Sequence, residues 1–322
     1  MRAFFLAAIL ALALPAHALQ RTVLFEAFTA TWCGPCGVAA PALEQLQHEV
    51  GDSLVIAGIH ANGDPFYQSD AHTRYDYYGV QYIPTVYADG VLHYTSSTNA
   101  YSHYRSMFDL RKTVDQPVQF SLGGVYDANA LQGTLRVWVK HVGEETAWSG
   151  RLRIYTVLVD TPYAWQGHSH LYWVVRDLVP DPAGVPVSLA PGDSVAVAQP
   201  FTVPATDSPY KTAFVVFLQR DDTREVLGAH PLFFLHDLDW VGVAEENHAV
   251  SSGLRLRATP VGRELRLSVQ GLARPAPLSV YDATGRLVLR RRIGNGRHTL
   301  RLGPGVYVYR LLNHTGKVVV LP

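Results

Sequence analysis

The spacing of hydrophobic and polar positions changes along this chain. Between residues 21 and 116 short apolar runs alternate with stretches of helical period, which predicts strands that alternate with helices. Asp89-Gly90 is a strong signal for a hairpin turn. The predicted order is βαβαββα, with strands at 22–28 and 54–60, helices at 34–50, from 69 or 70 to 78 and at 101–112, and a hairpin of 84–88 and 91–95.

Two later regions have the period of β-strands. Alternating runs between residues 117 and 235 are separated by Gly, Pro, Asp and Asn, a pattern typical of an antiparallel sandwich. Residues 236–252 have weak periodicity and predict a linker. Short strands follow again over 253–322. We therefore expect an α/β domain at 19–116 followed by two all-β, sandwich or immunoglobulin-like, domains.

The first residues have the layout of a secretory signal peptide. Arg2 precedes an apolar run from Phe4 to Leu14, and the small-residue pattern Ala16-His17-Ala18 follows. A membrane anchor is the weaker interpretation, because so short a run spans too little of a ~30 Å hydrocarbon core. We expect cleavage of residues 1–18 and an exported protein that passes through the periplasm.

Composition narrows the class of protein. Hydrophobic residues make up 48% and charged residues 17%, so the chain is not disordered. The formal net charge of +0 hides an asymmetry, because residues 253–322 hold twelve Arg and one Lys against Glu264 and Asp282, a local charge of +11. Only two cysteines exist, which excludes a disulfide framework and a four-thiolate metal site.

Both cysteines lie where a predicted strand ends and a helix begins. Cys33 at a helix N-terminus is expected to have a lowered pKa and to be the attacking thiolate. Cys36 is placed one turn on, to resolve a mixed disulfide. Gly34 permits the tight turn, and Pro35 fits an early helix position. A structural disulfide or half a zinc site are the weaker alternatives, so we expect no metal and no cofactor beyond the Cys33–Cys36 pair.

These residues carry a family resemblance. WCGPC at 32–36 and YIPTVYADG at 82–90 resemble the thioredoxin superfamily. The resemblance implies a cis Ile83–Pro84 peptide and a substrate segment held along the backbone of Ile83, with Trp32 shielding the pair.

One position departs from the thioredoxin pattern. Ala27 stands where thioredoxins keep a buried aspartate. Two alternatives remain open: a bulge turns Glu26 inward as proton acceptor for Cys36, or that base is absent and water serves.

A wider resemblance covers most of the remaining chain. Residues 21–235 are similar to an exported thioredoxin-fold family named after a twenty-eight-kilodalton outer-membrane protein. The C-terminal pieces VYDATGR, GVYVYR and GKVVV resemble the sorting domain of type IX secretion. That resemblance implies contact with the outer-membrane secretion machinery or lipopolysaccharide, and a final place on the outer-membrane surface or outside the cell.

The function we expect is an exported thiol-disulfide oxidoreductase. Its substrates would be protein thiols and disulfides, and its electron donor is unknown. Nucleic acid is not an expected partner, because the aromatic residues of the basic region alternate inward. The alternative is a non-catalytic cell-surface binding or adhesion protein that retains a thioredoxin fold, with Cys33–Cys36 as a local disulfide.

Overall fold

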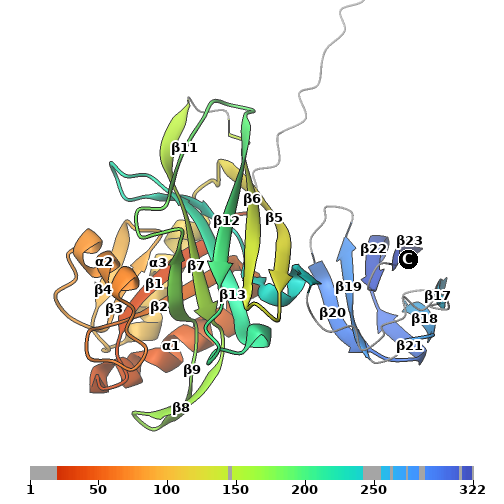
Figure 1. Ribbon diagram of the computed structural model, residues 1–322, viewed down its shortest axis with the longest axis horizontal. Helices are drawn as coiled ribbons and strands as arrows, with labels where there is room; N and C mark the ends of the chain where they lie inside the picture. The colour runs from red at the N-terminus through yellow and green to blue at the C-terminus, as the bar shows by residue number, and fades with distance from the viewer. Residues whose placement is uncertain are drawn as a thin grey trace, which may run out of the picture. The chain divides into compact units, whose positions relative to one another are not determined.

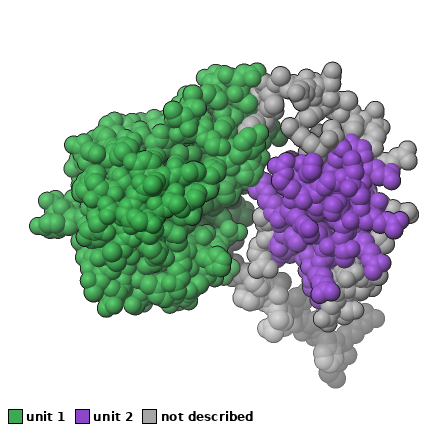
Figure 2. Space-filling view, turned by 90° about the horizontal axis from the view of Figure 1, so that it is seen from below, with its two compact units in different colours: residues 1–243 green, residues 244–322 purple. Residues whose placement is uncertain are grey.

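The computed structural model describes residues 20–143, 147–241, 255–261, 264–272, 275–282, 287–311 and 314–320. They fall into two compact units, divided between Val243 and Ala244 (Figure 2). The expected signal peptide, residues 1–18, lies outside the described residues.

The α/β region forms as its periodicity predicts, and each predicted element begins and ends within about one residue of the observed one. Its β1 and β2 are buried on both faces, which their unbroken apolar runs require. The elements in chain order are β1 (Val23–Thr29), α1 (Gly34–Val50), β2 (Leu54–His60), α2 (Ser69–Tyr78), β3 (Thr85–Ala88), β4 (Leu92–Thr95) and α3 (Ala100–Lys112), as labelled in Figure 1.

The following region is almost entirely β, as the period of two predicts. Its strands are β5 (Val118–Asp127), β6 (Gln132–His141), β7 (Trp148–Leu158), β8 (Thr161–Trp165), β9 (His168–Leu171), β10 (Val174–Val179), β11 (Val185–Leu189), β12 (Ser194–Thr202), β13 (Thr212–Gln219), β14 (Val226–Ala229), β15 (Phe233–Phe234) and β16 (Asp239–Val241).

One mixed sheet joins the two regions. Its main path has the order β14-β13-β7-β10-β2-β1-β3-β4, with β11 paired to β7 and β15 to β13. At the junction, the amide of Gly58 in β2 donates to the carbonyl of Trp173 at 2.7 Å, just before β10. The predicted boundary at 116–117 therefore does not separate two compact units, and the sheet continues across it.

The two faces of this sheet have different covers. On one face of β7 and β13 lies the four-stranded sheet β12-β6-β5-β16, and Val137, Ile154 and Val216 belong to the core between the two sheets. On the other face α2 packs against β1, β2, β7 and β13 through Tyr75 and Tyr78. The predicted sandwich thus forms, but one of its sheets belongs to the α/β region as well.

The predicted linker 236–252 begins too early. A 3-10 turn at Leu235–Asp237 leads into β16, which pairs in parallel with β5. This pairing extends the smaller sheet by one strand, so residues 239–241 belong to the first unit. The remaining residues of the predicted linker lie outside the described residues.

The second unit is a β-sandwich of its own. Its three-stranded sheet β17-β18-β21 and four-stranded sheet β20-β19-β22-β23 share one apolar core, which includes Leu267, Val280 and Leu311. The strands are β17 (Arg255–Val261), β18 (Glu264–Gln270), β19 (Ala276–Asp282), β20 (Leu287–Ile293), β21 (Gly296–Arg301), β22 (Gly305–Leu311) and β23 (His314–Val320). Across the described residues of both units, no helix combines the length and hydropathy needed to span a membrane.

Candidate functional site

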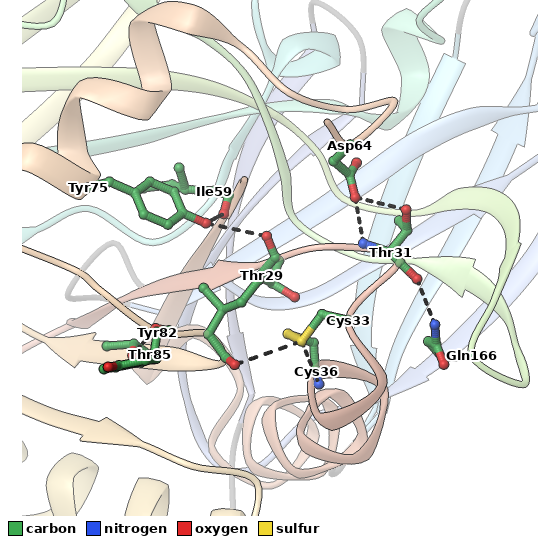
Figure 3. The surroundings of a disulfide bond; sticks show 11 residues. Thr29, Thr31, Cys33, Cys36, Ile59, Asp64, Tyr75, Tyr82, Thr85 and Gln166 are labelled. Carbon is green, nitrogen blue, oxygen red and sulfur yellow. Dashed lines mark hydrogen bonds between the residues drawn. A yellow bond between two sulfur atoms is a disulfide. The ribbon is translucent and has the colours of Figure 1, made fainter. Parts of the chain in front are cut away.

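The cysteine pair lies in the first turn of α1, directly after the loop that leaves β1. Cys33 is the N-cap residue, and the amide of Cys36 donates to its Sγ at 3.2 Å. The two sulfurs form a disulfide (Figure 3). Pro35 occupies the first turn, where an amide donor would have no partner within the helix. The predicted strand-to-helix position of the pair is thus the observed one.

The segment before β3 lies beside this pair. Ile83–Pro84 is a cis peptide, as the resemblance to thioredoxins implies. The carbonyl oxygen of Ile83 lies 3.8 Å from Cys33 Sγ. Thr85 Oγ1 donates to the carbonyl of Tyr82 at 2.7 Å and ties the turn together. The fold therefore brings Cys33, Cys36, Ile83 and Pro84 together from segments about fifty residues apart.

The surface around the disulfide is apolar and partly open. Cys33 is 6% exposed and Cys36 2% exposed, so both residues are largely buried and Cys33 is the more exposed of the two. Beside them, Trp32 is 55% exposed and Tyr82 is 76% exposed. These two exposed aromatic residues directly precede Cys33 and Ile83 in the sequence.

Asp64 fixes the loop that carries the pair. Its Oδ2 accepts hydrogen bonds from the amide and the hydroxyl of Thr31, the latter at 2.8 Å (Figure 3). His60 Nδ1 lies 3.0 Å from Asp64 Oδ1. Burial alone would raise the pKa of Asp64, but the His60 ring and these hydrogen bonds lower that pKa to about 2. A buried carboxylate thus anchors the residue two positions before Cys33.

The structure does not bring Glu26 to the cysteine pair. Its carboxylate accepts two hydrogen bonds from Arg74, each of 2.9 Å, and one each from the hydroxyls of Tyr78 and Tyr155. Burial would raise the pKa of Glu26, but the Arg74 charge and these hydrogen bonds lower it. Glu26 therefore stays ionised on the α2 face of the sheet, and no bulge turns it toward Cys36. Its neighbour Ala27 faces α1 and α3 instead.

A cavity of about 50 Å³ adjoins Cys36, and its lining includes Ala27, Pro84 and Trp173. Glu44 of α1 and His60 are titratable groups in the same lining. Burial raises the pKa of Glu44, an effect that the neighbouring His168 partly offsets. A carboxylate that the sequence analysis did not select thus borders the same space as Cys36.

The β8–β9 hairpin also reaches this site, which the sequence analysis did not foresee. Trp165 and Leu171 pack in one apolar cluster with Cys33 and Cys36. Two histidines of the hairpin have partners of their own: His168 Nε2 lies 2.7 Å from the carbonyl of Gly37, and His170 Nδ1 lies 3.0 Å from the Ser169 hydroxyl. Within the described ranges, no three His, Cys, Asp or Glu side chains gather as metal ligands would.

Comparison with known proteins agrees with this geometry. A family model described as Thioredoxin matches residues 16–115. The N-terminal region is a thioredoxin-family domain. Thioredoxin of Rhodospirillum rubrum is 42% identical over 65 residues, which are 20% of this chain and 56% of that protein. Thioredoxin of Bacillus subtilis is 42% identical over 64 residues, which are 20% of this chain and 55% of that protein.

The chain spans about half the length of these curated relatives. Among solved structures, HBP35 of Porphyromonas gingivalis is similar over 94% of this chain and 98% of that one, with a TM-score of 0.55 and 18% identity. This second likeness concerns the fold alone, and it extends beyond the thioredoxin domain into the β regions. A thioredoxin domain whose two cysteines form a disulfide supports a role of the thiol-disulfide oxidoreductase type.

Proposed function

We propose that this protein is an exported thiol-disulfide oxidoreductase that acts on the disulfides of other proteins. The observation that carries the proposal is the position of Cys33 at the N-cap of α1, with the Cys36 amide directed at its sulfur. Free amide donors and the helix dipole favour a thiolate at such a position. The thiolate is the form that attacks a disulfide.

The proposed reaction begins with the reduced pair. The Cys33 thiolate attacks one sulfur of a substrate disulfide, and the other substrate sulfur leaves as a thiolate that takes up a proton. Cys36 then loses its proton and attacks Cys33 Sγ, which restores the Cys33–Cys36 disulfide and releases the second substrate thiol. Two electrons pass from the protein dithiol to the substrate disulfide. Pro84 and the Ile83 carbonyl would position an extended substrate segment beside Cys33, and the exposed Trp32 would contact it.

The dipeptide between the cysteines supports a reducing or isomerising direction. Gly34-Pro35 resembles thioredoxin, whose potential is about −270 mV, more than strong oxidants at about −120 mV. Repeated turnover then needs a dithiol donor that reduces the Cys33–Cys36 disulfide again.

An assay of disulfide reduction tests this function. With dithiothreitol as donor, the protein should accelerate the reduction of insulin and of two short peptides joined by a disulfide. Cys33→Ser should show no turnover. Cys36→Ser, the matched variant, should accumulate a mixed disulfide with the peptide when it is first reduced and then mixed with the peptide after removal of dithiothreitol. Equal rates for the wild type and Cys33→Ser would contradict the proposal.

We also propose export and a sorting role for the basic C-terminal region. Their support is the pattern of residues 1–18 and the charge of +11 over residues 253–322, which would favour an anionic glycolipid or translocon surface. Mass spectrometry of the secreted protein should find an N-terminus near Leu19 and loss of the C-terminal unit. A full-length periplasmic product would contradict the sorting role.

A non-catalytic surface protein is the second candidate, and the small exposure of Cys33 favours it. In that case the disulfide would only stabilise the first turn of α1. The two candidates differ in thiol reactivity after reduction: a catalytic Cys33 should react with iodoacetamide at neutral pH faster than free cysteine does, and an inert one should react more slowly.

A further inference from the structure

The β8–β9 hairpin projects from the β region to the cysteine pair, and Figure 1 shows it beside α1. Trp165 pairs with His168 across the turn. The two turn residues, Gln166 and Gly167, have φ values of 43° and 87°. Positive φ at both central positions is the geometry of a type I′ turn, which continues the twist of its strands. Glycine adopts it freely, whereas glutamine rarely does, so the hairpin places a long polar side chain at its tip at some conformational cost.

The hairpin holds both ends of the segment that carries the cysteines. Gln166 Nε2 donates to the carbonyl of Thr31 at 3.1 Å (Figure 3). His168 Nε2 lies 2.7 Å from the carbonyl of Gly37. Thr31 comes two residues before Cys33, and Gly37 comes directly after Cys36. The approach at Gly37 is so close that a Cβ there would lie 2.5 Å from the Cβ of Gln166.

Apolar packing closes the same side of the disulfide. Trp165 is 9% exposed and Leu171 is 3% exposed, and both share a cluster with Cys33 and Cys36. The indole Nε1 donates to the carbonyl of His170 at 2.9 Å, so the hairpin itself fixes the orientation of Trp165. The carbonyl oxygen of Ile83 also lies beside the disulfide, 3.8 Å from Cys33 Sγ.

We infer that the β8–β9 hairpin is a substrate-selecting wall of the dithiol site, which admits disulfides in extended, flexible segments and excludes those in the surface of a folded domain. The inference rests on the proposed function. An extended substrate segment can lie along the Ile83 backbone as a neighbouring strand would, and the space it needs is the spacing between strands, about 4.8 Å. A folded surface would have to displace Trp165 and Leu171. Gln166 and His168 are positioning residues here, because they act through the hairpin and not on the reacting sulfurs.

The variant Gln166→Asn/His168→Phe loosens the wall. Asparagine tolerates positive φ but is one methylene too short to reach Thr31 as glutamine does. Phenylalanine keeps a ring beside Trp165, whose centroid lies 5.1 Å from that of His168, but it has no ring nitrogen for the Gly37 carbonyl. His170→Phe is the matched control on the same strand, because the His170 ring contacts Ser169, Asp160 and Tyr172 rather than α1.

The experiment compares two substrates under the same donor, a linear peptide pair joined by a disulfide and folded lysozyme. Wild type and His170→Phe should both prefer the peptide. In the double variant, the ratio of the peptide rate to the lysozyme rate should fall about tenfold. In each single variant it should fall about threefold, as expected for weakening the hydrogen bonds that hold the wall.

An unchanged ratio in an active double variant would overturn the inference and leave the proposed function intact. An equal loss of rate on both substrates would also overturn it, because the hairpin would then only support the fold. If neither the wild type nor the variants reduce any disulfide, the proposed function fails and the inference fails with it. Alkylation of reduced Cys33 gives a readout without turnover: the double variant should gain more reactivity toward a maleimide with a long polyethylene glycol chain than toward iodoacetamide.

Discussion

Two carboxylates that adjoin the cysteine loop and its cavity, Asp64 and Glu44, have opposite environments. Asp64 receives hydrogen bonds from Thr31 and lies beside His60, so its charged form is favoured despite burial. Glu44 has no comparable set of donors, and burial raises its pKa. We therefore expect Asp64 to anchor the loop, and we propose Glu44 as the proton acceptor for Cys36 in the proposed reaction.

Asp64→Asn should destabilise the protein at neutral pH. The pKa of Asp64 is lower in the folded state, about 2 against a usual 3.8, so its stabilisation is present above pH 4 and is lost as the pH falls toward 2. This shift corresponds to about 2 kcal/mol in the free energy of unfolding. Urea unfolding should show that Asp64→Asn has a much lower free energy of unfolding than wild type at pH 7. Near pH 2 the two proteins should differ little. The exposed control Asp76→Asn should leave the free energy of unfolding unchanged at both pH values. An equal decrease for Asp64→Asn at both pH values would contradict the anchoring role of Asp64.

Glu44→Gln should slow the step in which Cys36 attacks the mixed disulfide. An ionised Glu44 can take the proton of Cys36 through water in the shared cavity, and such general base catalysis contributes about a hundredfold or more. Because burial raises the pKa of Glu44, the wild-type rate of this step should rise with pH through that raised value. The variant should lose this dependence.

Single-turnover release of a peptide thiol, followed against pH, measures the step. Glu49→Gln on the same helix is the control, because the Glu49 carboxylate is bonded to Tyr101 and Gln45 and does not line the cavity. A Glu44→Gln variant with the rate and pH profile of wild type would remove Glu44 from the mechanism.

The sequence predicted the position of the cysteine pair but not which way Glu26 points. Cys33 and Cys36 are specified locally, by a strand, a turn and a helix start. The direction of Glu26 depends on which face of the sheet α1 covers, and adjacent strand residues point to opposite faces. Local periodicity does not supply that choice and leaves both alternatives open, whereas the buried ion pair with Arg74 fixes the direction of Glu26.

At the scale of elements, α1 and the β8–β9 hairpin depend on each other through Gly37. Helices usually gain about 1 kcal/mol when glycine becomes alanine. Here the added Cβ would meet Gln166 at 2.5 Å, and such overpacking costs about 1–3 kcal/mol. Because of this close contact, Gly37→Ala should lower the free energy of unfolding, whereas the same substitution in a helix usually raises it.

Gly37→Ala should destabilise the wild-type chain, yet be neutral or stabilising in a Gln166→Gly background. Glycine at 166 removes the colliding side chain and suits the φ of 43°. A double-mutant cycle by urea unfolding measures the coupling between the two positions. If Gly37→Ala lowers the free energy of unfolding equally in both backgrounds, the hairpin does not pack tightly against α1 at this position.

Elements themselves were predictable, whereas their contacts were not. The α/β region is correct to within about one residue because apolar runs, caps and the Asp89-Gly90 turn each signal the same boundary. Nothing in the period of residues 161–171 indicates that this hairpin packs on α1, about 130 residues earlier. Long-range packing of a short hairpin has no local signature, so Trp165 and Gln166 were missed.

At the scale of the whole molecule, the first unit contains the complete candidate site. The thioredoxin elements and the following β region share one sheet, and Arg21, Asp89, Arg111 and Glu225 link them in a chain of ion pairs between 2.7 and 2.9 Å. The thioredoxin-family match ends at residue 115, next to the predicted boundary, but the sheet continues past it because β10 pairs with β2, a pairing that cannot be read from either strand alone.

A chain that ends at Val243 should reduce the peptide substrate at the rate of the full chain and keep its thermal midpoint. Every described residue of the site and of its cores lies before that point. A chain that ends at Gln116 should fold poorly, since it lacks β10, which pairs with β2, and β7 and β13, which pack against α2. Activity that disappears with residues 244–322 would contradict this division.

The reduction potential of the Cys33–Cys36 pair tests the proposed chemistry most directly. Equilibration of the protein with defined ratios of reduced and oxidised dithiothreitol, followed by mass spectrometry of the trapped thiols, gives this potential. We expect a value near −270 mV, at which the pair can donate electrons and be reduced again. A value below about −300 mV, typical of a structural disulfide, would contradict a redox role for this site.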